Sequence, residues 1–117
     1  MNDMEATILE YVRRKGGGVS FAELQDIEGF KGEMAMCLDA YPSIVLWPFV
    51  LEAGAVALRS LLDTHLDWRG CSPLVYFIDG SVPCSKPYQQ MPIAKSMRHY
   101  KKDHWLPGTF SLKKKSR

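Results

Sequence analysis

Three residues near the C-terminus belong to the types that bind metal ions. His99, Asp103 and His104 lie close together in the chain, and on a helix His99 and Asp103 would share one face. Their spacing matches neither the His-Glu-x-x-His pattern of metalloproteases nor a cysteine–histidine zinc pattern. We therefore interpret them as surface or interfacial side chains, and we expect no metal site and no cofactor.

The cysteines are the other reactive groups in the sequence. Cys71 or Cys84 could pair with a histidine, but catalysis would need a lowered thiol pKa and an orienting third group, and the local sequence supplies neither. Cys37 completes an odd set of three without a Cys-x-x-Cys, which disfavours a disulfide framework and a zinc ribbon. The glycines of residues 16–18 are not followed by the Lys-Ser/Thr of a phosphate loop. We predict that the protein is not an enzyme.

Charge is distributed unevenly along the 117 residues. Residues 1–80 carry 12 acidic and 6 basic side chains, a net charge of −6, whereas residues 81–117 carry 9 basic side chains and one acidic, a net charge of +8. The total of +2 hides this asymmetry. An acidic body followed by a basic segment often accompanies contact with nucleic acid or with an acidic surface.

Basic and aromatic side chains alternate in this C-terminal segment, which makes it the main candidate binding site. Its cations could neutralise phosphates, and its aromatic rings could stack on bases. The same cations could instead contact an acidic partner, the acidic body of a second copy, or residues 1–80 of the same chain. The candidate residues are Lys95, Arg98, Tyr100, Lys101, Lys102 and Trp105.

The composition is that of a small globular domain. Hydrophobic residues make up 46% of the chain and charged residues 24%, so a core can form without disulfides. No apolar run reaches the ~18 residues of a membrane-spanning helix. The acidic start, residues 1–5, does not resemble a secretory signal. We expect a cytoplasmic protein of α+β fold with no membrane partner.

Capping residues and periodicity predict the elements of the N-terminal part. A helix is expected over residues 4–15, capped by Asp3 and stopped by three glycines. A short extended piece follows, and then a short helix over residues 21–27, with Ser20 and Glu23 as its capping box.

The middle of the chain is less regular. Residues 32–41 could form a third short helix or an irregular crossing, and the run SIVLW before Pro48 predicts a buried strand. An apolar stripe predicts a helix over residues 51–64. The two runs LDWRG and PLVYFID, separated by Cys71 and Ser72, predict a β-hairpin.

The opening ILEYVRRKGGGVSFAELQDI resembles the first helix, strand and helix of winged helix-turn-helix domains. With IVLWPFV, ALRSLLDTH, SPLVYFIDG and YKKDHWLP, the chain is similar over most of its length to small uncharacterised winged-helix-like proteins of bacteria and their mobile elements. The resemblance implies a winged-helix-like fold, with the hairpin as its wing, and no activity. We expect that domain to span residues 1–82, followed over residues 83–117 by a basic arm that runs extended over the body.

The surface that would read DNA in a winged helix has the wrong chemistry here. The predicted helix over residues 51–64 has Arg59 as its only basic residue, and its carboxylates would repel phosphates. In the predicted wing, Arg69 is balanced by Asp67. The apolar run that contains Phe49 is expected to be core, and it would become a partner or homodimer patch if exposed. Arg59, Arg69 and Phe49 are possible interface residues.

We expect a non-enzymatic binding module that acts by protein–protein contact. Its acidic body and apolar helix stripe would dock on a host nucleoprotein or regulatory complex, and the arm would add electrostatic attraction. Phage and mobile-element proteins of this size, including inhibitors of CRISPR-type defences, often act in this way, which is an analogy of size and charge. The alternative is a winged-helix DNA-binding transcriptional regulator that uses the basic arm for phosphate contacts. The sequence predicts neither the partner's identity, nor DNA specificity, nor the oligomeric state.

Overall fold

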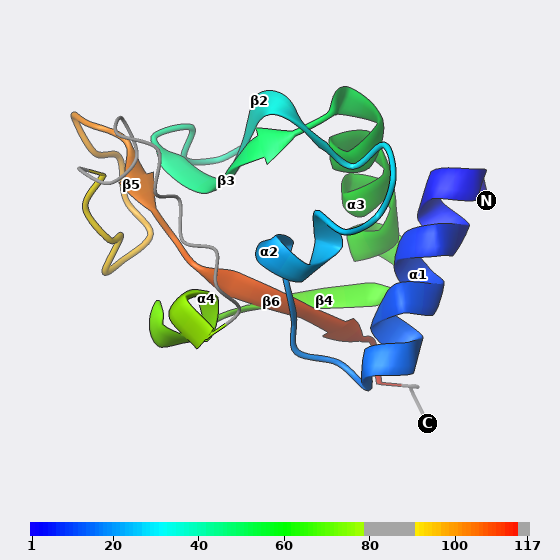
Figure 1. The fold of residues 1–117 in the computed structure, drawn as a ribbon. Coiled ribbons are helices and arrows are strands. Elements are labelled where there is room, and N and C mark those ends of the chain that lie inside the picture. The colour runs from blue at the N-terminus through cyan, green and yellow to red at the C-terminus, as the bar shows by residue number, and fades with distance from the viewer. Residues whose placement is uncertain (79–90, 115–117) are drawn as a thin grey trace.

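The computed structural model describes residues 1–78 and 91–114, and within them it is a mixed α+β fold with two small sheets (Figure 1). Helix α1, Asp3–Lys15, begins at a capping box in which the Glu5 N–H donates to the Asn2 side chain, so Asn2 rather than Asp3 is the cap. It ends at Gly16, whose φ of 80° is the left-handed conformation that glycine adopts readily.

The next two elements confirm the predicted capping box. Strand β1, Val19–Ser20, leads directly into helix α2, Phe21–Leu24. The Ser20 hydroxyl accepts from the Glu23 N–H, and the Glu23 carboxylate accepts from the Ser20 N–H. Helix α2 is shorter than the expected 21–27, because the chain turns beyond Leu24.

Residues 31–37 form a strand, so the helix considered for residues 32–41 is wrong. Strand β2, Lys31–Cys37, pairs antiparallel with β3, Ile44–Val50, through several irregularities of register. Most side chains of β2 are exposed and Met36 is buried. The helical spacing of the apolar residues was therefore misleading. Strand β2 is the edge strand of its sheet, beside β3, so most of its side chains can face solvent.

Strand β3 confirms the buried strand and extends it through Pro48. Pro48 lies outside the short parallel pairing of β3 with β5, which involves only Ile44 and Val45, and in an irregular part of the pairing with β2. A missing N–H is tolerated at such a position. Trp47 is 1% exposed, which confirms the prediction that this run is core.

Helix α3, Glu52–Thr64, confirms the predicted helix, and its apolar face is buried against α1 and the strands. Gly54 permits the close approach, because a Cβ there would lie 2.8 Å from the ring of Phe30. Ser60 on α3 donates a hydrogen bond to Glu5 on α1. Most of the stripe expected to dock on a partner is therefore used inside the protein, while Val56 stays exposed.

The predicted hairpin does not form. Strand β4, Leu66–Gly70, pairs antiparallel with β6, Gly108–Leu112, and the apolar run after it forms helix α4, Leu74–Ile78. The Ser72 hydroxyl accepts from the Leu74 N–H at the start of α4. The helix directs Tyr76 into the core, where its hydroxyl donates to the carbonyl of Gly108 and accepts from the N–H of Phe21.

The C-terminal segment contributes strands to both sheets. One sheet has the order β1-β6-β4 and the other the order β2-β3-β5, with β5 at His104–Trp105. Strand β6 is thus a central strand, and Phe110 on it is 0% exposed. The expected boundary between residues 82 and 83 lies outside the described residues. The strands after it belong to the fold and do not run over its surface, because their alternating apolar side chains complete the core.

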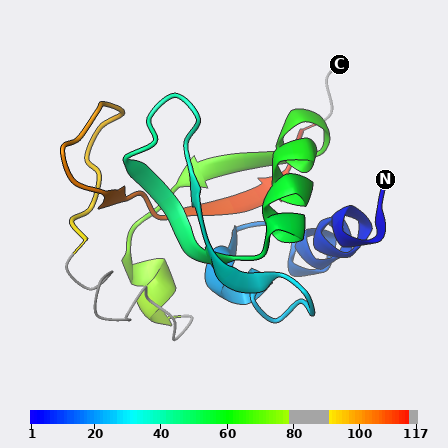
Figure 2. The ribbon, with the colours of Figure 1, turned by 90° about the horizontal axis from the view of Figure 1, so that it is seen from above.

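An aromatic cluster joins the two sheets at the centre of the core. The Trp47 ring stacks on Phe21 at 5.9 Å and on Tyr76 at 5.3 Å, and Phe110 meets Phe21 edge-on at 5.1 Å. Such pairs stabilise a core beyond the area they bury. Figure 2 shows α1 and α3 at one end of the molecule and β5 with the loop before it at the other. No helix in the described ranges is long and apolar enough to cross a membrane.

Candidate functional site

The structure places five of the six candidate residues in the loop of residues 92–104, here called the basic loop. These five are the four cations and Tyr100. Backbone hydrogen bonds close its base, since Ala94 donates to the carbonyl of Trp105 and Trp105 donates to the carbonyl of Pro92. The loop therefore leaves the fold and returns at one place. Its exposed cations are Lys95, Arg98, Lys101 and Lys102.

Ser43, in the connection between β2 and β3, ties the far side of the basic loop to the body. Its hydroxyl accepts from the Tyr100 N–H at 3.0 Å, and its carbonyl accepts from the His104 N–H at 2.8 Å. The neighbouring Tyr41 ring contacts the His99 ring at 5.0 Å. These contacts give the basic loop a defined path beside residues 41–43.

Tyr100 organises the interior of the basic loop. Its hydroxyl donates to the carbonyl of Ser96 and accepts from the Ser96 N–H, while its ring stacks on His104 at 3.7 Å and lies under Arg98 at 4.7 Å. Hydrogen bonding to Ser96 lowers the pKa of Tyr100, and Arg98 acts in the same direction. Because the ring already has these contacts, Tyr100 is a scaffold of the loop more than a free stacking platform.

The cations of the basic loop have no carboxylate partners among the described residues. The ion pairs found there join Arg13 and Arg14 to Glu10, Lys15 to Glu23, and Arg59 to Asp39. The loop is therefore held by backbone groups and rings, while its charges face solvent. None of these cations forms an ion pair with an acidic side chain of residues 1–78, so the contact with residues 1–80 of the same chain that was considered from the sequence is not an ionic one in the described residues.

The prediction that Trp105 is a binding residue is wrong. It is 4% exposed and packs against Tyr76 at 5.1 Å and Trp47 at 6.5 Å, so it cannot stack on a ligand. In the pairing of β5 with β3, the Trp105 side chain points into the core and leaves His104, the preceding residue, at the surface.

The three possible interface residues lie on separate elements and do not extend the basic loop. Arg59 on α3 pairs with Asp39 at 3.6 Å. Arg69 lies on β4, and Phe49 is half-buried with its ring edge-on to Trp47 at 5.9 Å. Phe49 therefore belongs to the border of the core and not to an exposed apolar patch.

The groups considered for metal binding and catalysis have other contacts. His104 Nδ1 lies 2.8 Å from the carbonyl of Lys102, and His99 lies against Tyr41. No cluster of three metal-binding side chains occurs in the described part of the chain. Cys71, one of the two cysteines considered for a catalytic pair, is half-buried and packs against the core. Burial raises the pKa of the third cysteine, Cys37, which is the opposite of what a nucleophile needs. Cys84, named with the histidines as a possible catalytic pair, lies outside the described residues.

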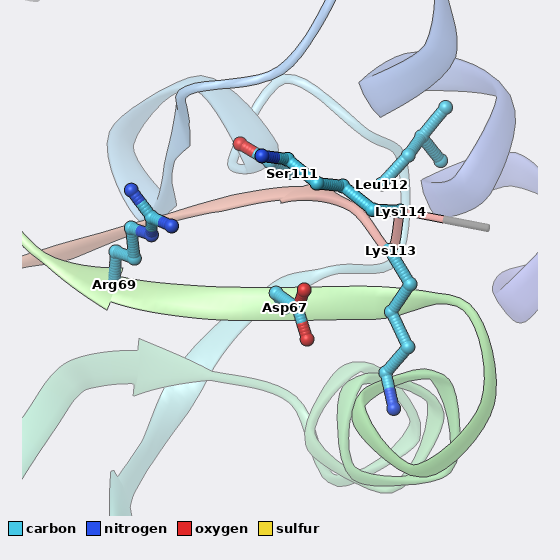
Figure 3. A pocket seen from close by; sticks show the side chains of 6 residues that line it. All are labelled: Asp67, Arg69, Ser111, Leu112, Lys113 and Lys114. Atoms are coloured by element: carbon cyan, nitrogen blue, oxygen red, sulfur yellow. The ribbon is translucent and has the colours of Figure 1, made fainter. Parts of the chain in front are cut away.

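Sequence reasoning named Arg69 as a possible interface residue and Lys113 and Lys114 among the cations that could contact phosphates. It did not predict that the structure joins them in one hollow on the sheet of β1, β6 and β4 (Figure 3). We call it the sheet hollow. It is lined by Asp67, Arg69, Ser111, Leu112, Lys113 and Lys114. The pairing of β4 with β6 creates it, and that pairing could not be predicted once Arg69 had been assigned to a hairpin with the wrong partner.

Comparisons of the chain with protein-family models, with curated proteins and with solved structures found no match. What the protein binds is therefore inferred from the chemistry of its exposed residues.

Proposed function

We propose that the protein is a non-enzymatic module that binds the sugar–phosphate backbone of nucleic acid through the basic loop. The observation that carries this proposal is the set of four exposed cations without carboxylate partners on a loop with a defined path. Lysine and arginine side chains so arranged release counterions from a polyanion when it binds, which favours association at low salt.

The order of elements supports a winged-helix-like interpretation of the fold. Strand β1 lies between α1 and α2 in the chain, and the other two strands of its antiparallel sheet, β4 and β6, follow α3, which is the order of a winged helix. Two insertions distinguish the chain: the β2–β3 hairpin between α2 and α3, and residues 71–107 between β4 and β6. In this interpretation the basic loop is part of an enlarged wing.

The chemistry of α3 argues that the contact would be insensitive to sequence. Base reading in the major groove needs donors and acceptors on an exposed helix. The exposed face of α3 carries Glu52 and Asp63, and its one cation, Arg59, lies beside Asp39. Binding through the basic loop alone would be steeply salt-dependent and similar for different sequences.

This proposal takes the alternative of the sequence analysis and moves away from protein–protein contact through α3. Ala55, Leu58 and Leu61 of the α3 stripe are buried in the core, so most of the stripe is not available for docking. A nucleoprotein complex presents the same phosphates as free nucleic acid. Action on such a complex, as in phage or mobile-element inhibitors of CRISPR-type systems, would therefore use the same loop and is included in the proposal.

The test is fluorescence anisotropy with labelled 24-base-pair duplex DNA of random sequence, over a series of salt concentrations. We expect binding by the intact protein, and markedly weaker but still measurable binding at low salt by the double variant Arg98→Glu, Lys101→Glu. Each phosphate contact contributes about 0.9 to the slope of log affinity against log salt, so the double variant should lower the slope by about 2. Both side chains are exposed, and the fold should be unchanged.

A charge-matched control separates the basic loop from net charge. The variant Arg14→Glu, Lys31→Glu changes two exposed cations outside the loop by the same amount of charge. It should retain most of the affinity of the intact protein. Equal losses in both variants would overturn the assignment to the loop. No binding of duplex or single-stranded DNA or RNA at low salt would overturn the proposal, and poly-glutamate would then be the next probe, as a mimic of an acidic protein.

A further inference from the structure

The sheet hollow is a second cationic surface that the basic loop does not include. Asp67 and Arg69 are alternate residues of β4, so their side chains lie on the same face of the sheet, with Ser111 of β6 opposite Asp67. Lys113 follows directly after β6 (Figure 3). This outer face of the sheet thus has a hollow lined by three cations, one hydroxyl, one carboxylate and one leucine side chain.

The charges of the sheet hollow are not neutralised within the described residues. Asp67 is its one carboxylate, and it forms no ion pair with Arg69, Lys113 or Lys114. Ser111 accepts a hydrogen bond from the Gly18 N–H at 2.9 Å, which fixes its side chain while leaving its hydroxyl proton for another acceptor. Three cations and a hydroxyl donor around one carboxylate suit an anionic group such as a phosphate.

The segment of residues 104–113 connects the basic loop to the sheet hollow. Residues 104–113 include β5 and β6, and the chain through these two strands leads from the basic loop toward the end of the molecule that holds α1 (Figure 1). At about 3.3 Å per residue, an extended chain of this length spans roughly 30 Å. The longest dimension of the molecule is 39 Å, so this separation fits within it.

We infer that one nucleic acid contacts both surfaces, with its backbone running from the basic loop to the sheet hollow. The inference rests on the proposed function. Roughly 30 Å is the largest separation, from the basic loop to Lys113 at the far end of the hollow, and it corresponds to at most about nine base pairs of duplex at 3.4 Å per step. A longer nucleic acid that reaches the second surface binds it at a high effective concentration, so its affinity exceeds that of a short one without any new type of contact.

The test measures affinity against length, with DNA hairpins whose stems have about 6, 9, 12 and 18 base pairs. For the intact protein we expect affinity to rise about tenfold or more between the shortest and the third stem, and slowly thereafter as more positions become available. The variant Arg69→Gln, Lys113→Gln, Lys114→Gln should bind the shortest stem as the intact protein does. It should lack the steep rise with length.

Two further variants make the outcomes distinguishable. Lys113→Gln with Lys114→Gln leaves β4 unchanged and should show a weaker form of the same effect, which guards against misfolding caused at Arg69. Arg98→Glu with Lys101→Glu should weaken binding at every length. A loss in the hollow variants that is equal at all lengths, or no loss at any length, would overturn two-point contact while leaving the loop proposal intact. Failure of the intact protein to bind any stem would overturn both.

Discussion

Strand β6 and the basic loop come from the same basic, proline-containing segment, yet different forces hold them. Strand β6 has a hydrogen-bonded neighbour on each side, and its Phe110 is fully buried. The basic loop is attached by a few backbone bonds at its base and by Ser43, and its cations face solvent. Stability and candidate function are therefore carried by different side chains of one segment, and substitutions should separate them.

The largest effect is expected in β6. Phe110→Ala removes a ring that packs edge-on against Phe21 at 5.1 Å, and it should lower the free energy of unfolding by about 3–5 kcal/mol. Urea denaturation followed by circular dichroism would measure the change. Lys101→Ala in the basic loop is the matched control and should change stability by less than about 0.5 kcal/mol. Similar losses of unfolding free energy in the two variants would show that stability is not carried by β6 more than by the basic loop.

Local signals in the sequence were sufficient for helices α1, α2 and α3, whereas the run that forms α4 was predicted as a strand. The capping box of Ser20 and Glu23, the glycine at the end of α1 and the apolar stripe of α3 all act within a few residues, so each could be predicted without knowing the rest of the fold. These predictions succeeded because capping hydrogen bonds and apolar periodicity involve residues that are close together in the sequence.

The sheets could not be predicted in the same way, because their partners are far apart in the chain. We predicted that LDWRG pairs with the next apolar run along the chain. Its actual partner is β6, where Phe110 lies opposite Trp68 of β4, and many residues separate the two strands in the sequence. The bulk of Trp68 leaves no room for a side chain at Gly108, a match that is visible only once the pairing is known. The exposure of the cations could be predicted because charged side chains stay in water. The burial of Trp105 could not, because it depends on the pairing of β5 with β3.

A smaller effect is expected where the basic loop meets the body. Ser43→Ala removes the hydroxyl that accepts from the Tyr100 N–H and should destabilise the protein by about 0.5–1.5 kcal/mol. The consequence should be local. Trypsin should cleave after Arg98 and Lys101 faster than in the intact protein, while cleavage after Arg13 should be unchanged, as measured by mass spectrometry. Uniformly faster cleavage would mean that Ser43 supports the whole fold and not this loop.

The smallest effect tests whether the interior of the basic loop has this arrangement in solution. Hydrogen bonding to Ser96 lowers the pKa of Tyr100 below its usual value of about 10, and Arg98 acts in the same direction. Arg98→Ala should therefore raise that pKa, measured by ultraviolet or NMR titration with Tyr100→Phe identifying the signal among the five tyrosines. Because the folded state favours the phenolate, stability should rise with pH between the lowered pKa and 10, and that gain is lost as pH falls through the lowered pKa. An unchanged pKa in Arg98→Ala would place Arg98 away from the ring and free it entirely for a ligand, which would sharpen the contrast between the loop and β6.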